Sequence, residues 1–242
     1  DNSDNSDNQK KQYLKMITYN KDLLSKDFIQ KYGIYRSVIL NQDNKVLCFS
    51  PPKSISYDMF IDKYPEKQAD IIAEEFVEGT MINIFWDENI GLSGGWEIST
   101  KNNVGGANIF YQNTKTFREM FLEAVKENNL QLDLLNKKYC FSFILQHPDN
   151  RIIVRFKKPQ LYFITCYSIF QFDNSSPYVL ESDLSIIKTY INLNTQIKFP
   201  EIYYWNYYKE LENKCASQNT NYEIVGVMIK NIKTGERTKI RN

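Results

Sequence analysis

Short runs of apolar, β-branched and aromatic residues recur along the chain between polar turns, and such runs are typical of strands. Short runs of this kind at residues 37–40 and 45–49 flank a polar turn and predict a hairpin. The last two runs flank Thr234-Gly235, which favours a second tight turn. The remaining strands are predicted at residues 75–86, 96–100, 139–146, 151–156, 161–170, 222–231 and 236–241.

Other segments repeat their apolar residues every three or four positions, which indicates helices. The clearest lies at residues 116–125, where Thr116 and Glu119 have the spacing of a capping box. Further helices are predicted at residues 22–32, closed by Gly33, and at 183–191 and 200–215. Strand pairs that follow one another, with helices inserted between them, predict an α+β fold with antiparallel sheets flanked by helices.

The chain begins with a repeat of Asp, Asn and Ser and has no apolar residue before Tyr13. Such a segment buries too little apolar surface to offset its ordering entropy, so residues 1–12 are predicted to be a disordered tail. No internal repeat or linker divides the rest. Residues 13–242 are therefore expected to form a single domain.

Composition narrows the location and the partners. The formal net charge is +1, so a polyanion would have to be recognised by a local patch. No apolar run reaches the roughly 20 residues of a membrane span, and no signal peptide is visible. We expect a cytoplasmic protein of a host or virus-infected cell, without membrane attachment. The chain has four cysteines, Cys48, Cys140, Cys166 and Cys215. They lack metal-ligand or redox spacing, so we expect buried free thiols.

The segment Phe76-Val-Glu-Gly-Thr-Met-Ile82 contains the most informative polar residue of the chain. On a strand, Phe76 and Glu78 would share one face. Gly79 would allow a base or ribose to approach the backbone closely. A carboxylate in an apolar strand needs a partner, because burying it alone costs several kcal/mol. The alternative is an edge strand with Glu78 in water.

Several short motifs follow one another in a recognisable order. They are Tyr35-Arg-Ser-Val-Ile39, Pro52-Lys53, Phe76-Val-Glu-Gly-Thr80, Ser99-Thr-Lys101, Phe143-Ile-Leu-Gln-His-Pro-Asp-Asn-Arg-Ile-Ile153, Val225-Gly-Val-Met228 and Lys239-Ile-Arg241. Taken together, they resemble the adenylating domain of ATP-dependent RNA ligases of the phage T4 RNA ligase 1 kind. The resemblance spans residues 35–241 and implies the covalent-nucleotidyltransferase fold, with a nucleotide cleft between antiparallel sheets in which Lys239 lies opposite Phe76. The sequence ends just after the last motif, so we expect no C-terminal ligase domain in this chain.

The departures from this family pattern fall on its reactive positions. The family's nucleophile is a lysine that forms lysyl-AMP, and Phe76 stands in its place. No lysine lies between Lys67 and Lys101, so a shift of register does not restore one. Ile144 and Val225 stand where the family has glutamates, and Glu223, two residues upstream of Val225, is a partial substitute on the same strand face. Loss of a catalytic nucleophile typically costs on the order of a millionfold in rate.

The resemblance implies a binding set that survives these changes. The predicted nucleotide- and phosphate-binding residues are Arg36, Lys53, Glu78, Gly79, Lys101, Lys239 and Arg241. ATP and Mg²⁺ are the implied cofactors, and a nucleotide, an RNA end or a protein is the expected partner. Three hypotheses stay open: a pseudoenzyme that binds nucleotide or RNA ends, an active ligase that uses Lys53 or Lys239, and a structural or interaction protein, viral in origin, that keeps only the fold.

Two other features have structural interpretations. His147 is the only histidine, which excludes a multi-histidine metal site, and its place beside Pro148 favours a hydrogen-bonded turn residue. An aromatic run at residues 203–208 has the composition of a base-stacking surface, although packing of these residues in the core is favoured.

Overall fold

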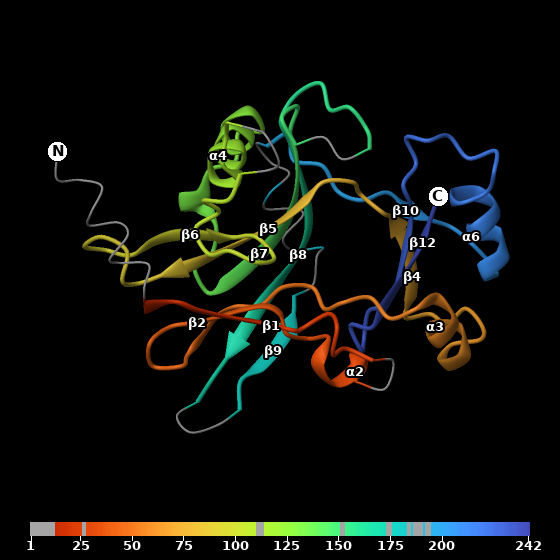
Figure 1. Cartoon of the computed structure of the whole chain (residues 1–242), viewed down its shortest axis with the longest axis horizontal. Coiled ribbons are helices and arrows are strands. Elements are labelled where there is room, and N and C mark those ends of the chain that lie inside the picture. The colour runs from red at the N-terminus through yellow and green to blue at the C-terminus, as the bar shows by residue number, and fades with distance from the viewer. Residues whose placement is uncertain are drawn as a thin grey trace.

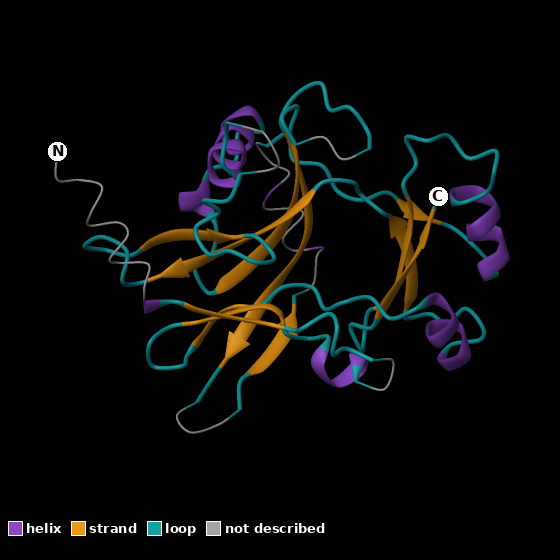
Figure 2. Cartoon of the chain, in the orientation of Figure 1, coloured by secondary structure: helices purple, strands orange, loops and turns teal. Residues whose placement is uncertain are grey.

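The strands form three antiparallel sheets with helices on their outer faces (Figures 1 and 2). This arrangement comes from a computed structural model, which describes residues 13–25, 28–109, 114–150, 153–172, 176–182, 185, 191 and 195–242. The fold is α+β, as the sequence predicts. The disordered tail predicted for residues 1–12 lies outside the described residues, as does most of the helix predicted at residues 183–191.

The largest sheet has five strands in the order β6-β5-β7-β8-β9. One face is covered by helix α4 (Phe117–Glu127), which buries Met120 and Phe121 completely. Each large apolar side chain buried in this way contributes roughly 1.5–3 kcal/mol. The strands are β5 (Thr80–Asp87), β6 (Gly95–Ser99), β7 (Tyr139–Gln146), β8 (Gln160–Phe170) and β9 (Tyr178–Glu181).

A four-stranded sheet has the order β10-β4-β11-β12 and lies on the right in Figure 1. Two helices, α3 (Tyr57–Lys63) and α6 (Tyr208–Cys215), share an apolar core with it in which Phe60 and Leu211 are buried. Its strands are β4 (Ile71–Glu75), β10 (Ile202–Tyr203), β11 (Gly226–Asn231) and β12 (Arg237–Arg241).

The third sheet is built from β1 (Lys15–Thr18), β2 (Arg36–Leu40) and β3 (Val46–Cys48). It packs on the face of the five-stranded sheet that α4 leaves open, through a cluster that includes Phe85 and Tyr167. A four-residue helix, α2 (Ile29–Tyr32), precedes β2, and a short 3-10 helix, η2 (Leu132–Leu134), precedes β7.

The segment that we predicted as one strand at residues 75–86 contains the last residue of one strand, a connection and most of a second strand, which lies in another sheet. Strand β4 ends at Glu75, and β5 begins at Thr80 in the five-stranded sheet. The break occurs at Gly79, whose φ of +140° is open to glycine but strained for other residues. Phe76 and Glu78 therefore lie on the connection between two sheets rather than on one strand face, and this prediction was wrong. Apolar composition alone does not reveal where a chain leaves one sheet for another.

A buried ion cluster also joins the two sheets. Lys230 of β11 lies 3.6 Å from Glu74 of β4 and 3.8 Å from Glu181 of β9. The side chain of Lys230 is only 4% exposed. Removing one partner from such a cluster leaves an uncompensated buried charge, so the cluster holds the two sheets in one relative position.

Several of the sequence predictions are confirmed. Helix α4 begins at the predicted capping box, with Thr116 and Glu119 bonded reciprocally. Strands β7 and β8 and the hairpins β2–β3 and β11–β12 form where expected. The four cysteines are buried and free. His147 is a turn residue, because its Nδ1 accepts the backbone N–H of Asp149 at 3.1 Å while Nε2 lies 2.9 Å from Glu123.

Two predicted helices are shorter than expected. Within the described part of residues 22–32, only Ile29–Tyr32 is helical, since Leu23 stays 75% exposed and offers the segment little packing. The helix predicted at residues 200–215 begins only at Tyr208. Before it, Ile202–Tyr203 pairs with β4, which makes this stretch an edge strand.

The aromatic run follows the two-residue period of that edge strand. Tyr203 and Trp205 are buried, whereas Tyr204 is 92% exposed. Further along, Tyr208 is buried and Tyr207 is 63% exposed. The core interpretation therefore holds for three of the five rings.

The strand predicted at residues 151–156 is absent from its described part, 153–156. The backbone N–H groups of Ile153 and Val154 donate to the carboxylate of Glu78 instead of to a neighbouring strand. No helix among the described residues is long and apolar enough to cross a membrane.

Candidate functional site

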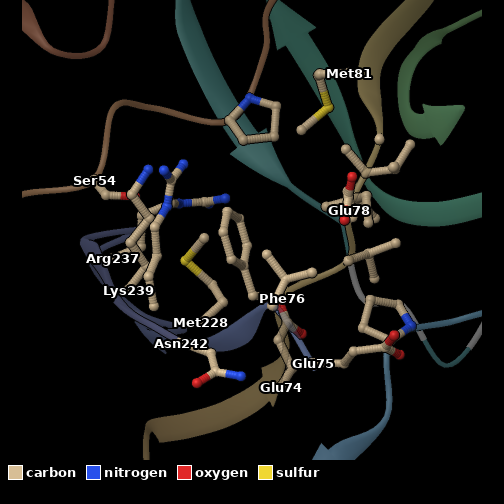
Figure 3. Close-up of a pocket in the computed structure, with 18 of the residues that line it drawn as sticks. Ser54, Glu74, Glu75, Phe76, Glu78, Met81, Met228, Arg237, Lys239 and Asn242 are labelled. Atoms are coloured by element: carbon tan, nitrogen blue, oxygen red, sulfur yellow. The ribbon is translucent and has the colours of Figure 1, made fainter. Parts of the chain in front are cut away.

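A cavity of about 360 Å³ opens where the chain passes from the four-stranded to the five-stranded sheet. The β4–β5 connection forms part of its lining, and strands β2, β4, β5, β7, β8, β11 and β12 contribute further residues. Figure 3 shows Arg237 and Lys239 facing the ring of Phe76 across this space, with Glu78 on the far side of the ring.

One side of the cavity is lined by four cations, Arg36, Arg237, Lys239 and Arg241, which we call the cationic wall. Three of them come from β12, where side chains two residues apart point to the same face. The partner strand β11 places Met228 opposite Lys239 and Gly226 opposite Arg241. The wall therefore follows directly from the alternation of a single strand, completed by Arg36 of β2.

Gly226 lets β11 and β12 approach each other closely beneath this wall. Its φ is +138°, and a Cβ atom at this position would lie 2.1 Å from the carbonyl oxygen of Ile240. Any other residue would push β12 away from β11. This glycine fixes where Arg241 stands.

Arg237 is the most deeply buried member of the wall. It is 5% exposed, and its Nη2 has no hydrogen-bond partner among the described residues. A buried donor without a partner costs about 1–3 kcal/mol, and more when it is charged. An anion bound in the cavity would satisfy this donor.

The cations of the wall stand close enough to perturb one another. Burial, together with the charges of Arg241, Arg36 and Lys53, lowers the pKa of Lys239 to about 8 from its ordinary value of 10.5. Burial is also the main cause of a lowered pKa at Arg36. A site that disfavours its own positive charges favours a negatively charged ligand, because the ligand relieves their repulsion.

Phe76 separates the cationic wall from the rest of the cavity. The Nζ of Lys239 and the Cζ of Arg241 each lie 5.4 Å from the centroid of its ring. A cation held over an aromatic face gains about 0.5–2 kcal/mol. The sequence prediction that Lys239 lies opposite Phe76 in a cleft between two sheets is confirmed.

Three glutamates also line the cavity, but their charges are largely engaged or suppressed. Glu74 is paired with Lys230. Glu78 accepts the backbone N–H groups of residues 153 and 154 at 2.5–3.1 Å. Glu75 accepts the backbone N–H of Glu201 at 3.3 Å, and burial is the main cause of its raised pKa. The potential in the cavity is therefore dominated by the cations.

The side formed by the five-stranded sheet is apolar. Met81 of β5, Ile144 of β7 and Ile164 of β8 line it, and we call these three residues the apolar wall. Val225, next to Gly226, extends this apolar surface on the four-stranded sheet. A planar ring or a sugar fits such a surface, and the charged part of the same ligand would face the cationic wall.

A second cavity of about 270 Å³ adjoins the first on the other side of Phe76 and Val225. It contains Glu201 and Glu223, with Lys214 as a cation. Glu223 lines this adjoining cavity and not the one that carries the cationic wall. Its suggested role as a stand-in for the glutamate replaced by Val225 is therefore unsupported by its position.

The structure gathers most of the predicted binding residues. Arg36, Glu78, Gly79, Lys239 and Arg241 all line the cavity, as do Phe76, Ile144 and Val225, the three residues that the sequence resemblance places at the family's catalytic positions. We predicted that Gly79 lets a base or ribose approach the backbone. In the structure the group that approaches it is the carbonyl oxygen of Leu145, which would lie 2.5 Å from an added Cβ.

The two other predicted lysines lie outside the lining. Lys53 is near enough to Lys239 for its charge to help lower that pKa. Lys101 turns toward the N-terminal segment, where its Nζ lies 5.2 Å from the ring centroid of Tyr19. The loops that carry Lys53 and Lys101 decide where these side chains lie, and the local residue pattern does not encode the paths of these loops.

The sequence prediction omitted Arg237, although a signal for it was present. On β12 it precedes Lys239 by two residues and Arg241 by four, so a strand places all three on one face. The strand period would have identified it, whereas the motif comparison did not include it.

Comparisons with known proteins bear on this arrangement. The chain is 29% identical over 104 residues to an RNA ligase of Rhodothermus phage RM378, a match that covers 39% of this chain and 22% of the phage protein. No protein-family model matches the chain.

Solved structures give a broader match. Three variants of Naegleria gruberi RNA ligase, two of them with ATP and Mn, superpose with TM-scores of 0.53–0.54 at 11–12% identity. The superposition covers 80–81% of this chain and 55–56% of the ligase, so this chain spans about half the length of that protein. The chain therefore has the nucleotidyltransferase fold of these RNA ligases.

The fold raises the question of whether the residues present suit a nucleotide and a metal ion. The cationic wall and the unpartnered Nη2 of Arg237 suit the phosphates of a nucleotide. The site suits a metal ion less well, because no group of three acidic, histidine or cysteine side chains among the described residues has the arrangement to hold one. The sequence resemblance also predicts that Ile144 and Val225 stand at two positions where the family has glutamates.

Proposed function

We propose that this domain binds a nucleotide or the 5′-phosphorylated end of an RNA without forming a covalent bond to it. The observation that carries the proposal is the pairing of the cationic wall with an aromatic ring at the position of the family's nucleophile. In this proposal the phosphates lie against Lys239 and Arg241, and Arg237 donates its unpartnered Nη2 from below.

The apolar wall would hold the uncharged part of the ligand. Met81, Ile144 and Ile164 offer a surface for a base or ribose, and the cavity volume of about 360 Å³ is within the usual range for small-molecule sites. ATP and GTP both have this division into an apolar ring and a charged chain. A divalent ion would enter with the phosphates, because the domain itself supplies few free carboxylates here.

Phe76 explains why binding is proposed without covalent chemistry. Its ring has no lone pair with which to attack phosphorus, and it lies against Lys239 and Arg241. The apolar replacements at Ile144 and Val225 remove two further polar groups from the same site. Three charge-assisted hydrogen bonds of about 1.5–3 kcal/mol each are sufficient for binding alone.

Ligand-induced stabilisation tests this function. At a hundredfold excess over Kd, ATP, GTP or a 5′-phosphorylated oligonucleotide should stabilise the domain by about 2.7 kcal/mol, equivalent to a rise in Tm of about 5–10 °C. The rise should shrink as salt increases, because phosphate contacts are screened. It should also shrink in a folded Lys239→Ala, Arg241→Ala double variant.

A matched control uses Lys209→Ala, Lys233→Ala, which removes the same charge from exposed positions outside the cavity. This control should keep the full rise in Tm. Absence of any rise at millimolar ligand would contradict nucleotide binding and leave the structural or interaction-protein hypothesis in its place.

A second candidate function is favoured by one observation, the lowered pKa of Lys239. At a pKa of about 8, roughly a tenth of this amine is unprotonated at pH 7, far more than for an ordinary lysine, and a nucleophile requires this unprotonated form. In this alternative, Nζ attacks the α-phosphorus of ATP and a phosphoramide bond forms. The bond from phosphorus to the pyrophosphate oxygen breaks, pyrophosphate leaves, and the amine proton passes to solvent.

Incubation with α-labelled ATP and Mg²⁺, followed by denaturation, separates the two candidates. Non-covalent binding predicts no label on the denatured chain. An acid-labile label mapped to Lys239 by mass spectrometry, and lost in Lys239→Arg, would establish the covalent alternative.

A further inference from the structure

A groove on the N-terminal segment exposes an unusual number of aromatic rings. Tyr19, Phe28, Tyr32 and Tyr35 line it together with aliphatic residues of the same segment, and its volume is about 520 Å³. Phe28 is 51% exposed, Tyr32 is 40% and Tyr35 is 38%. We call this surface the N-terminal groove. Exposed rings gathered in one hollow mark a binding surface more often than scattered ones do.

The two most accessible rings form one continuous surface. The centroids of Phe28 and Tyr32 lie 5.8 Å apart with their planes tilted by 47°. They are too close to hold a third ring between them, so a planar ligand would stack on their outer faces. Every nucleic-acid base has such a planar face, and stacking on aromatic side chains does not depend on which base it is.

Lysines surround these rings. The Nζ of Lys31 lies 5.3 Å from the ring centroid of Tyr32, and that of Lys101 lies 5.2 Å from the ring centroid of Tyr19. The charge of Lys21 is close enough to Lys101 to help lower its pKa, although burial is the main cause. Aromatic rings with cations between them match a strand of bases joined by phosphates better than they match an apolar protein segment.

The groove and the cavity are lined by residues that are neighbours in the sequence. Tyr35 lines the groove, and the next residue, Arg36, lines the cavity. The backbone N–H of Tyr19 donates to the carbonyl oxygen of Tyr35 at 2.8 Å, so the two edges of the groove are joined next to Arg36. Arg36 also contributes to the lowered pKa of Lys101, so positive charge continues from one site to the other.

We propose that the N-terminal groove binds the unpaired nucleotides that follow a phosphorylated 5′ end held against the cationic wall. The bases stack on Phe28 and Tyr32, and the phosphates follow Lys31, Lys101 and Arg36 toward the cavity. This inference rests on the proposed function, because the cavity supplies the anchor for the 5′ end. It adds a preference for single strands, since bases paired in a duplex are not free to stack on protein side chains.

The test compares ligands that reach only the cavity with ligands that also reach the groove. Anisotropy of a 3′-labelled, 5′-phosphorylated oligouridine of about 10 nucleotides, a length within the range for single-strand sites, reports the affinity for a long ligand. ATP binding by calorimetry reports the cavity alone. The wild-type protein should bind the oligouridine at least tenfold more tightly than its blunt duplex with oligoadenosine.

The variant Phe28→Ala, Tyr32→Ala removes two exposed rings and leaves the cationic wall unchanged. It should lose about ten- to a hundredfold in oligouridine affinity, the range for stacked bases, while ATP affinity changes less than twofold. The matched control is Tyr204→Ala, Tyr207→Ala, which removes two exposed rings remote from the groove. It should leave both affinities unchanged.

The outcomes separate this inference from the proposed function. ATP binding with equal oligouridine affinity in wild type and the Phe28→Ala, Tyr32→Ala variant overturns the groove and leaves the cavity intact. Oligouridine binding that depends on Phe28 and Tyr32, without any ATP binding, supports the groove and overturns the proposed function. Equal loss in the control variant overturns the assignment to these rings. Concentration-dependent self-association that the groove variant abolishes, without oligouridine binding, replaces the inference with a protein interface.

Discussion

The two walls of the cavity differ in what they retain from the RNA-ligase pattern. The cationic wall carries the charged residues of the final motif, Lys239 and Arg241, and adds Arg237 from the same strand face. On the opposite side, Ile144 replaces a glutamate of the pattern with an aliphatic side chain. Charges that hold phosphates act one by one, whereas a nucleophile and its supporting carboxylates act as a unit. Under the proposed function, the cationic wall therefore still binds phosphates although the opposite wall lacks the groups needed for covalent chemistry.

The largest expected effect comes from adding a side chain at Gly226, where the two strands beneath the cationic wall leave no room for one. Gly226→Ala should lower the free energy of unfolding by about 3 kcal/mol or more, since the new Cβ meets the carbonyl of Ile240 at a positive φ. Urea denaturation measures the change. Gly91→Ala is the control, because its φ is also positive but nothing lies within 4 Å of the added atom, so a loss of about 1 kcal/mol is expected there. Equal losses in both variants would show that β11 and β12 tolerate separation.

The next largest effect tests what Glu78 does between the two walls. Glu78→Ala should destabilise the domain by about 2–4 kcal/mol, because the backbone N–H groups of Ile153 and Val154 lose their acceptor. Faster hydrogen exchange at these two amides would localise the effect. Glu88→Ala, at an exposed loop position, should be nearly neutral. A Glu78→Ala variant of normal stability but weak nucleotide affinity would instead assign Glu78 to the ligand.

Phe76→Lys sharpens the comparison by restoring the nucleophile of the family without its carboxylates. We expect no RNA ligation, because Ile144 and Val225 remain. The change replaces two cation–π contacts with a third cation beside Lys239 and Arg241, at a cost of about 1–2 kcal/mol of stability. Phe76→Met is the control for loss of the ring alone. Robust ligation by the lysine variant would mean that the apolar wall is not what prevents the chemistry.

The smallest effect is a pH dependence that arises from the cationic wall. Because the pKa of Lys239 is about 8 in the folded state and 10.5 ordinarily, the unfolded chain binds more protons between these values. Stability should therefore rise with pH from about 8 to 10.5, and Lys239→Met should remove this rise. Partial exposure of the side chain will keep the change small.

Nucleotide affinity should follow the opposite trend. It should fall as pH rises above about 8, where Lys239 loses the charge that attracts phosphate. Calorimetric titrations at several pH values measure this fall. An affinity independent of pH in the wild-type protein would mean that Lys239 does not contact the ligand.

Local patterns in the sequence determined much of the fold. The capping box before α4, the strand at residues 139–146 and the final hairpin all depend on neighbours within a few positions, and all form as predicted. The order of the motifs was also sufficient to indicate the fold and to bring Phe76 opposite Lys239. These features are readable because each depends on residue type and short-range spacing.

Only the tertiary structure decided how the site is divided. The segment predicted as one strand at residues 75–86 hides a change of sheet, since β4 ends at Glu75, β5 begins at Thr80, and the residues between them have no composition typical of a loop. Glu78 turns to the amides of a distant loop, and Glu223 and Val225 line different cavities. These arrangements depend on contacts between residues far apart in the chain, and no local pattern encodes which distant groups will meet.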